Sequence, residues 1–383
     1  MTTMTVLLAL LAIPAFAQLR NGEPETVGIN RAQLERAAGL LDSEVRDGKV
    51  GAASLLVARR GVVVLNKGFG HLSTTPGSPA ADKDSIFIVA SITKPVTAVS
   101  LMMLVEQGRL SLTDRVSRYI PEFKGADHEK VRVKDLLSHT SGMPDMLPEN
   151  TELRREHAPI QEFVKRAATT PLLFAPGTAF RYQSMGVLLA AEIVERLSKT
   201  PLRDFEREHI YTPLGMTRSS LGIGKMRIED TVQVMSTGED PKEFASWGPN
   251  SSYWRNFGAP WGGMHTTTHD LAALLQTFLD GGKFGGKELV SPATAKAMTS
   301  DQNEGLNAPW GLGWALGRST AWNRFGDLVS ARTFGHAGAS GTVEWADPET
   351  GLICVVLTNR PLGVDDGRLL RLVSNAVAAS AEK

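Results

Sequence analysis

Residues 87–108 read FIVASITKPVTAVSLMMLVEQG, and they place a hydroxyl and an amine three positions apart where an apolar run becomes helical. Ser91 follows the apolar run 86–90 and starts an amphipathic pattern that continues to Gln107. Residues three apart share a helix face, so the Lys94 amine can reach the Ser91 hydroxyl. Burial and the positive end of a helix favour a neutral lysine, which can accept the serine proton. The pattern therefore predicts a nucleophile beside its base.

The same spacing also has a plainer interpretation. Ser-x-x-Lys recurs from Ser380 to Lys383, in a tail where a catalytic role is implausible. A serine that caps a helix and is followed by an exposed lysine explains most isolated matches. Other residues must therefore support a catalytic interpretation of Ser91 and Lys94.

The composition indicates a globular protein whose partner is a small molecule. The 383 residues are 42% hydrophobic, which suffices for one large domain or two closely packed ones. Lys plus Arg and Asp plus Glu number 41 each, so the overall charge gives no sign of nucleic acid or an anionic membrane as partner. The single cysteine, Cys354, lies in an apolar run and is expected to fill the core, which excludes an intrachain disulfide and a cysteine-based zinc site. No cofactor is expected.

The first residues, MTTMTVLLALLAIPAFAQ, predict export. The apolar segment is too short to span a bilayer comfortably, and residues 15–17 form a small-x-small cleavage pattern. We interpret residues 1–17 as a signal peptide and expect a secreted or periplasmic protein, with no stable membrane insertion after its removal. No Lys or Arg precedes the apolar run, so a lipid-facing anchor helix is the alternative.

Patterns at the two ends of the chain predict strands. Residues 53–58 and 62–69 form one expected hairpin, and residues 341–346 and 351–358 form another around an Asp-Pro-Glu turn. Helices are expected at 31–45, 92–107, 134–139, 185–197, 271–279 and 368–379. The fold class is therefore α/β in the α+β sense, with one antiparallel sheet built from both chain ends and flanked by helices, plus a mostly helical lobe.

This arrangement predicts a division of the chain. Residues 18–82 and 258–383 form the expected sheet domain, and residues 83–257 form the helical domain, the two making a single catalytic unit. The stretches 77–84 and 247–263 are rich in Gly, Pro, Ser and Asn and are expected to be loops that shape a cleft. The site should lie where the two parts meet.

Two further motifs follow in order along the chain. Residues 180–184 read FRYQS and open a helix, and residues 334–338 read FGHAG and enter the C-terminal strands. With Ser91-x-x-Lys94 they resemble the three motifs Ser-x-x-Lys, Tyr-x-Asn and Lys-Thr-Gly or His-x-Gly of the serine β-lactamase and penicillin-binding protein superfamily. The chain is most similar to the branch with class C β-lactamases, D-amino-acid-specific peptidases and family VIII carboxylesterases. Phrases such as LLSHTSGMP and YTPLGMTRS extend the resemblance over nearly all the chain after the leader.

The resemblance implies a role for each motif residue. Ser91 is the expected nucleophile, Lys94 and Tyr182 share the proton transfers, and the backbone N–H groups of Ser91 and Ala339 form the oxyanion hole. The base stays open, because a Tyr182 phenolate held by a nearby positive charge and a neutral Lys94 would both serve. Hydrolysis through an acyl-enzyme is the implied mechanism.

Two positions depart from the penicillin-active pattern. Ser184 stands where the superfamily usually has Asn, and His336 stands where β-lactamases and transpeptidases have Lys. Together with Gly338, these are the residues expected to bind substrate. A short hydroxyl and a mostly neutral imidazole hold an amide and a carboxylate less well than Asn and Lys do. An ester needs less activation of its leaving group.

We therefore expect a carboxylesterase that acts on small or short-chain esters and hydrolyses β-lactams only weakly. The alternatives are a β-lactamase or D-amino-acid-specific peptidase and, from another class, a noncatalytic penicillin-binding or sensor protein. The expected partner is a small ester or amide. The sequence leaves the oligomeric state open.

Three other patterns in the sequence have structural explanations. His139 in the phrase HTSGM sits at a predicted helix end with Gly142 as terminator, so it is expected to be structural. His265 and His269 have metal-like spacing but lack a glutamate partner and a common helix, so no metal is expected. A cluster of aromatic residues is expected either to line an acyl pocket or simply to pack: Trp247, Tyr253, Trp254, Phe257 and Trp261.

Overall fold

A computed structural model describes residues 19–238, 240–319 and 324–382 of the chain. The expected signal peptide, residues 1–17, lies outside these ranges. Within them, no helix combines the length and the apolar character needed to cross a bilayer. Every strand and helix expected from the sequence is present, with ends that differ by a few residues.

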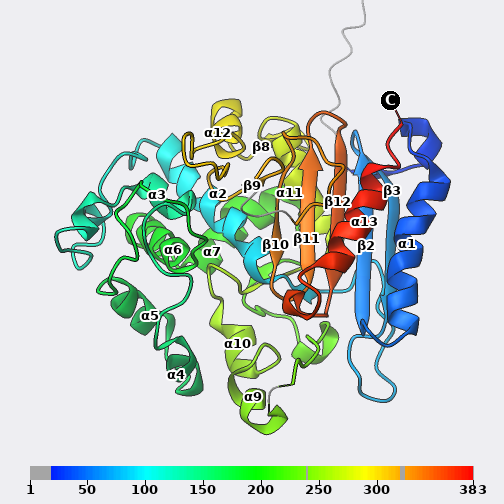
Figure 1. The fold of residues 1–383 in the computed structure, drawn as a ribbon, viewed down its shortest axis with the longest axis horizontal. Coiled ribbons are helices and arrows are strands. Elements are labelled where there is room, and N and C mark those ends of the chain that lie inside the picture. The colour runs from blue at the N-terminus through cyan, green and yellow to red at the C-terminus, as the bar shows by residue number, and fades with distance from the viewer. Residues whose placement is uncertain (1–18, 239, 320–323, 383) are drawn as a thin grey trace, which may run out of the picture.

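Within the described residues, the main sheet has seven strands in the order β1-β3-β2-β12-β11-β10-β9 (Figure 1). They are β1 (Arg20–Asn21), β2 (Ala52–Arg59), β3 (Val62–Gly70), β9 (Ala315–Leu316), β10 (Phe334–Gly338), β11 (Thr342–Asp347) and β12 (Leu352–Thr358). Strand β2 pairs with β12 in a register that sets Val57 opposite Cys354. The described pairs of this sheet are antiparallel apart from β1 with β3. The prediction of one sheet built from both chain ends is confirmed.

The hairpins turn where the sequence predicts. Arg60 (φ 51°) and Gly61 (φ 78°) both take left-handed conformations between β2 and β3, which match the twist of the strands they join. In the turn from β11 to β12, the Asp347 carboxylate accepts from the Glu349 N–H at 2.9 Å. A short acidic side chain thus replaces a backbone acceptor in the turn.

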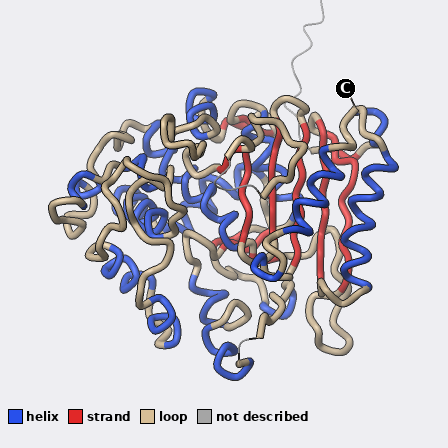
Figure 2. Tube along the Cα trace, in the orientation of Figure 1, coloured by secondary structure: helices blue, strands red, loops and turns tan. Residues whose placement is uncertain are grey.

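Helices cover both faces of this sheet (Figures 1 and 2). They are α1 (Arg31–Arg46) and α13 (Arg368–Ala378) on one face and α11 (Thr268–Leu279) on the other. Strand side chains alternate between the two cores: Val57 and Cys354 pack under α1 and α13, whereas Leu56 and Val355 belong to the core that reaches α11. Cys354 is fully buried, so its predicted place in the core is confirmed.

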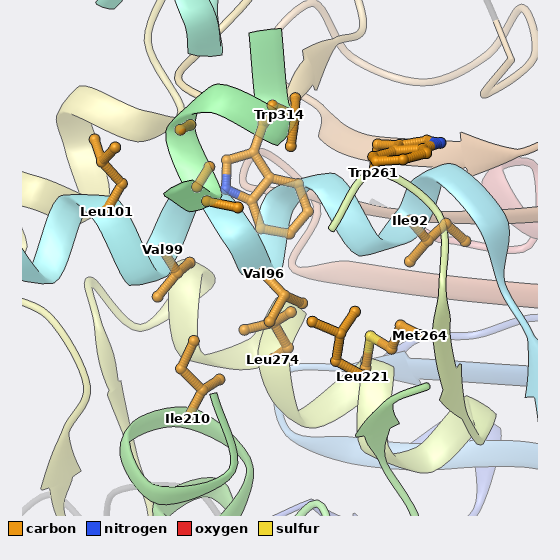
Figure 3. Close-up of a cluster of buried hydrophobic side chains, with 14 of the residues drawn as sticks. Ile92, Val96, Val99, Leu101, Ile210, Leu221, Trp261, Met264, Leu274 and Trp314 are labelled. Carbon is orange, nitrogen blue, oxygen red and sulfur yellow. The ribbon is translucent and has the colours of Figure 1, made fainter. Parts of the chain in front are cut away.

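The middle of the chain forms a helical lobe around α2. Its helices are α2 (Thr93–Glu106), α3 (Val133–Leu137), α4 (Asn150–Arg155), α5 (Ile160–Ala167), α6 (Met185–Ser198), α7 (Leu202–Glu206), α8 (Thr212–Leu214), α9 (Pro241–Trp247) and α10 (Ser252–Phe257), with α12 (Pro292–Met298) later in the chain. The expectation that α2 is amphipathic is wrong, because its residues 93–104 are all buried among neighbouring elements. Figure 3 shows Val96 of α2 beside Leu274 of α11, a contact region that joins the lobe to the layer under the sheet.

Part of the stretch 247–263, expected to be loop, is helical. The Ser251 hydroxyl accepts from the Trp254 N–H at 3.1 Å and so caps α10, and Gly258 ends this helix with φ 66°. The serine and glycine content that suggested a loop therefore supplies the two caps of a short helix. The residue boundaries of the two-domain division stay a prediction.

Candidate active site

Ser91 lies where a short strand turns into α2. The strand is β4 (Phe87–Ile88), which pairs with β6 (Met264–Thr266). Ala90 takes a left-handed conformation with φ 45°, which costs a non-glycine residue on the order of 1–3 kcal/mol and is typical of functional sites. Thr93 stabilises this turn, because its hydroxyl donates to the Ala90 carbonyl at 2.7 Å and accepts from the Met264 N–H at 3.0 Å. Ser91 is thus held in a fixed turn at the head of the helix.

Lys94 points back at Ser91 from the first turn of α2. Its Nζ donates to the Ser91 Oγ at 2.8 Å and to the Trp261 carbonyl at 2.9 Å. The side chain is almost fully buried, and burial lowers the pKa of Lys94 to about 7, while the charge of Asp145 opposes this shift. A large fraction of Lys94 is therefore neutral at neutral pH and able to accept a proton.

Tyr182 lies beside Lys94 and Ser91. Lys94 Nζ lies 4.8 Å from the centre of the Tyr182 ring, and the His139 ring packs on the tyrosine at a centroid distance of 4.6 Å. Burial raises the pKa of Tyr182 well above its usual value, and a hydrogen bond with Ser91 only partly offsets this. The phenol is therefore protonated at neutral pH. The structure brings Ser91, Lys94 and Tyr182 together, and their catalytic roles stay a prediction.

The end of β10 reaches the segment that carries Ser91. The Ser340 hydroxyl donates to the Ile88 carbonyl at 2.8 Å, and the Thr342 hydroxyl donates to the Val89 carbonyl at 3.1 Å. These two bonds fix the turn after β10 against the chain just before the nucleophile. They set Ala339, a predicted oxyanion-hole residue, beside the same cavity as Ser91.

Gly338 is required at this contact, because a Cβ there would lie 2.1 Å from the Val89 carbonyl oxygen. Gly338→Ala is expected to push β10 away from Ser91 and to lower kcat/KM on an ester by on the order of 100-fold, the usual cost of a misplaced catalytic group. The measurement is 4-nitrophenyl butyrate turnover. Gly39→Ala in α1 is the matched control, since open space surrounds that glycine. Full activity in Gly338→Ala would contradict the prediction.

Ser91 and Ala339 line a cavity of about 280 Å³. Its walls are mostly apolar and include Met146, Val234, Met235, Phe244, Trp254 and Trp261. Of the aromatic cluster expected from the sequence, Trp254 and Trp261 line this cavity. The other three members do not line it but pack behind its wall: Trp247 on Phe244, Phe257 on Trp254, and Tyr253 on Phe257. The cavity is large enough for a small acyl group.

In residues 19–238, 240–319 and 324–382, no group of three or more His, Cys, Asp or Glu side chains is placed to hold a metal ion. His265 is buried in β6, whereas His269 is exposed on α11. These two histidines therefore do not share an environment.

The sequence model of the family described as Beta-lactamase matches residues 37–378. The chain belongs to the beta-lactamase family. It is a serine hydrolase with the β-lactamase and transpeptidase fold, so the predicted superfamily, fold class and enzyme class are confirmed.

Relatives in sequence and proteins of similar fold are named for several different activities. A relative from Salmonella agona named "Putative D-alanyl-D-alanine carboxypeptidase" is 29% identical, over 94% of this chain and 91% of its own. A penicillin-binding protein homologue from Caulobacter crescentus is 25% identical with a TM-score of 0.74, covering 92% of this chain and 98% of its own. A family VIII carboxylesterase is 22% identical with a TM-score of 0.72, covering 91% and 98%, and shows the shared fold.

Two of the predicted substrate-binding residues, Ser184 and His336, are buried. Ser184 is buried, and its hydroxyl donates to the Asp145 carboxylate at 2.6 Å. His336 is fully buried on β10, with its Nδ1 2.7 Å from the Ala337 carbonyl, and burial lowers its pKa to about 3. Neither is among the described residues that line the cavity beside Ser91. Their contact with substrate stays a prediction, and His336 is neutral.

Three residues beside the beta-lactamase family motifs were missed as parts of the site. His139 has a left-handed φ of 62° and accepts from the Gln183 N–H at 3.2 Å, so it positions the Tyr182 loop. Asp145 holds Ser184 and lies close enough to affect the pKa of Lys94. Arg154 lines the cavity. For His139 the phrase HTSGM was a usable signal, but Asp145 and Arg154 belong to no motif.

Proposed function

We propose that the protein is a carboxylesterase that hydrolyses small esters through an acyl-enzyme on Ser91. The observation that carries this proposal is the 2.8 Å hydrogen bond between the buried Lys94 amine and the Ser91 hydroxyl. A serine hydroxyl becomes a useful nucleophile only when a base takes its proton as it attacks. Lys94 is the base in this proposal, because burial favours its neutral form and favours the protonated form of Tyr182.

In the acylation step, Ser91 Oγ bonds to the ester carbonyl carbon while its proton passes to Lys94 Nζ. The carbonyl oxygen becomes an oxyanion that accepts hydrogen bonds from the N–H groups of Ser91 and Ala339. The intermediate then collapses, its bond to the leaving alkoxide breaks, and the Tyr182 hydroxyl donates a proton to that alkoxide. Lys94 returns a proton to Tyr182, which leaves an acyl group on Ser91 and a free alcohol.

In the deacylation step, water replaces the alcohol. Lys94 accepts a proton from the water as its oxygen bonds to the acyl carbon, and the same oxyanion contacts stabilise the second intermediate. The bond from this carbon to Ser91 Oγ breaks, and the proton returns to the serine. The products are a carboxylic acid and the original enzyme.

The surroundings favour an ester over a β-lactam or a peptide. The cavity wall is mostly apolar, the His336 imidazole is neutral, and the Ser184 hydroxyl already donates to Asp145. His336 therefore offers no positive charge to the carboxylate of a penicillin. A second candidate, a D-amino-acid-specific peptidase or β-lactamase, is supported by the carboxypeptidase name of the Salmonella relative.

The experiment compares 4-nitrophenyl butyrate with nitrocefin as substrates of the wild-type protein. The ester is expected to be the better substrate by kcat/KM. A nitrocefin value far above the ester value would replace the proposal with the second candidate. Labelling of Ser91 by a fluorophosphonate without turnover of either substrate would indicate a noncatalytic binding protein instead.

The pH dependence follows from Lys94. Below its pKa of about 7 the amine is protonated and cannot accept the Ser91 proton, so kcat/KM is expected to fall about tenfold per pH unit under pH 6 and to level off above pH 8. Stopped assays of 4-nitrophenyl butyrate from pH 5 to pH 10, corrected for the uncatalysed rate, measure this. A rate that keeps rising through pH 9 would instead point to a tyrosine phenolate as base.

Export is part of the same proposal, supported by the leader pattern of residues 1–17. The protein is then secreted or periplasmic and meets its substrate outside the cytoplasm. Recovery of the full-length chain in the cytoplasmic fraction, with the leader intact, would contradict this part alone.

A further inference from the structure

Arg154 lies at the end of α4, next to two tryptophans. Its guanidinium Cζ lies 3.8 Å from the centre of the Trp254 ring, and Nη2 donates to the Trp247 carbonyl at 3.2 Å. The tryptophans belong to α10 and α9, which gather with α4 at one end of the molecule in Figure 1. The side chain is half-buried, and its Nε is buried with no hydrogen-bond partner.

The positive charge of Arg154 is not balanced by a neighbouring carboxylate among the described residues. Burial lowers the pKa of Arg154 to about 10, and the opposing charge effect comes only from Tyr253. The guanidinium is still charged at neutral pH. A charge held away from water normally has an ionic partner, because the lost hydration is costly. This arginine has donors that protein atoms leave unused.

The cavity that holds Ser91 also reaches this arginine. Arg154, Ser91 and Ala339 all line it, between the apolar walls formed by Trp254, Trp261 and others. In the acyl-enzyme the alcohol has already left, and the acyl group on Ser91 must occupy a space next to this residue while water attacks. The cavity is such a space. A planar guanidinium presents paired N–H donors that match a carboxylate.

We propose that Arg154 binds a carboxylate at the far end of the substrate's acyl group, so that the preferred substrates are esters of dicarboxylic acids with one acid group free. This inference rests on the proposed esterase function and narrows its substrate class. Arg154 is then a specificity-determining residue. The competing explanation is that it only stacks on Trp254 and Trp247 to hold α4 against α9 and α10.

The test uses two esters that differ in one charge, the mono-4-nitrophenyl ester of adipic acid and its methyl ester, 4-nitrophenyl methyl adipate. The wild-type protein is expected to prefer the acid. In Arg154→Met, which keeps an unbranched side chain on Trp254, the ratio of the two kcat/KM values is expected to fall by about 10- to 100-fold, mainly through KM. Arg154→Lys keeps the charge but loses the paired N–H donors of the guanidinium, so the ratio should fall by less than in Arg154→Met.

The neighbouring arginine supplies the matched control. Arg155 is exposed and does not line the cavity, so Arg155→Met should leave the ratio unchanged. Equal loss on both esters in Arg154→Met would reduce Arg154 to a stacking residue and overturn the proposal. So would a wild-type protein that hydrolyses the methyl ester and rejects the acid.

A binding measurement separates this inference from the esterase proposal. Free adipate is expected to raise the melting temperature of the wild-type protein but not of Arg154→Met, and adipamide, the uncharged analogue, should protect neither. This result would support the carboxylate site even if no ester were turned over, in which case only the esterase proposal would fail. The absence of any shift with adipate in the wild type would overturn the site itself.

Discussion

Ser91→Ala is expected to abolish ester hydrolysis, with kcat/KM for 4-nitrophenyl butyrate falling by at least ~10⁴-fold. The change removes the protein atom that forms a covalent bond to the substrate in the proposed mechanism, and nucleophile removal in serine hydrolases costs about this much or more. The residual rate should equal that of the oxyanion contacts alone. Initial rates corrected for the uncatalysed reaction measure the loss, and reaction with a fluorophosphonate should disappear with it.

The chain carries its own control for this variant. Ser380 begins the other Ser-x-x-Lys sequence, and its hydroxyl donates to the Val377 carbonyl at the end of α13. Ser380→Ala should therefore keep wild-type kcat/KM even if it lowers the melting temperature. Wild-type turnover by Ser91→Ala, in protein with a normal circular dichroism spectrum, would remove Ser91 as the nucleophile and end the proposed mechanism.

Lys94→Met is expected to lower kcat/KM by about 10³-fold while leaving the fold intact. Loss of a general base costs roughly 10²- to 10⁴-fold, and methionine fills nearly the same space as the lysine stem. Removing an almost fully buried amine also removes its desolvation penalty, so the free energy of unfolding should stay the same or rise. Activity assays and urea unfolding curves on the same preparation measure the two effects.

The opposite signs of these effects make the test specific. A structural lysine would lose stability and activity together, whereas a base loses activity alone. Lys165→Met on the exposed side of α5 is the control for charge removal and should change neither quantity. Turnover by Lys94→Met within tenfold of wild type would transfer the base role to Tyr182 or to another group.

The motif residues and the sheet could be predicted because local chemistry determines them. Ser91 and Lys94 come within 2.8 Å of each other through one turn of chain, a geometry that spacing alone dictates. The strand segments at both chain ends are either alternating or continuously apolar, and turn residues bound them. Their pairing into one sheet was predicted because such a sheet buries these apolar side chains. Tyr182 was found only through resemblance, since nothing local brings it to Lys94.

Arg154 and Asp145 could not be found in this way. The position of Arg154 depends on how α4 packs against α9 and α10, through contacts with residues about a hundred positions away. Asp145 is placed by its hydrogen bond with Ser184, which lies 39 positions further along the chain. Short helices were also hard to predict, as α10 shows, because cap residues and loop residues are the same amino acids. The all-round burial of α2 likewise depends on neighbours that no pattern within the helix reveals.

The pairing of β2 with β12 has a consequence for biosynthesis. A nascent chain that has emerged only as far as β9 already carries Ser91 and Lys94. It still lacks Ala339, and it lacks the strand that completes the sheet beside β2. Strand pairs between distant segments also form late, because the entropy of closing the long intervening loop is lost before the pair contributes any stability. In the proposed mechanism, hydrolytic competence therefore arises only after β10 to β12 have been translated, and a fragment that stops at β9 is expected to be inactive.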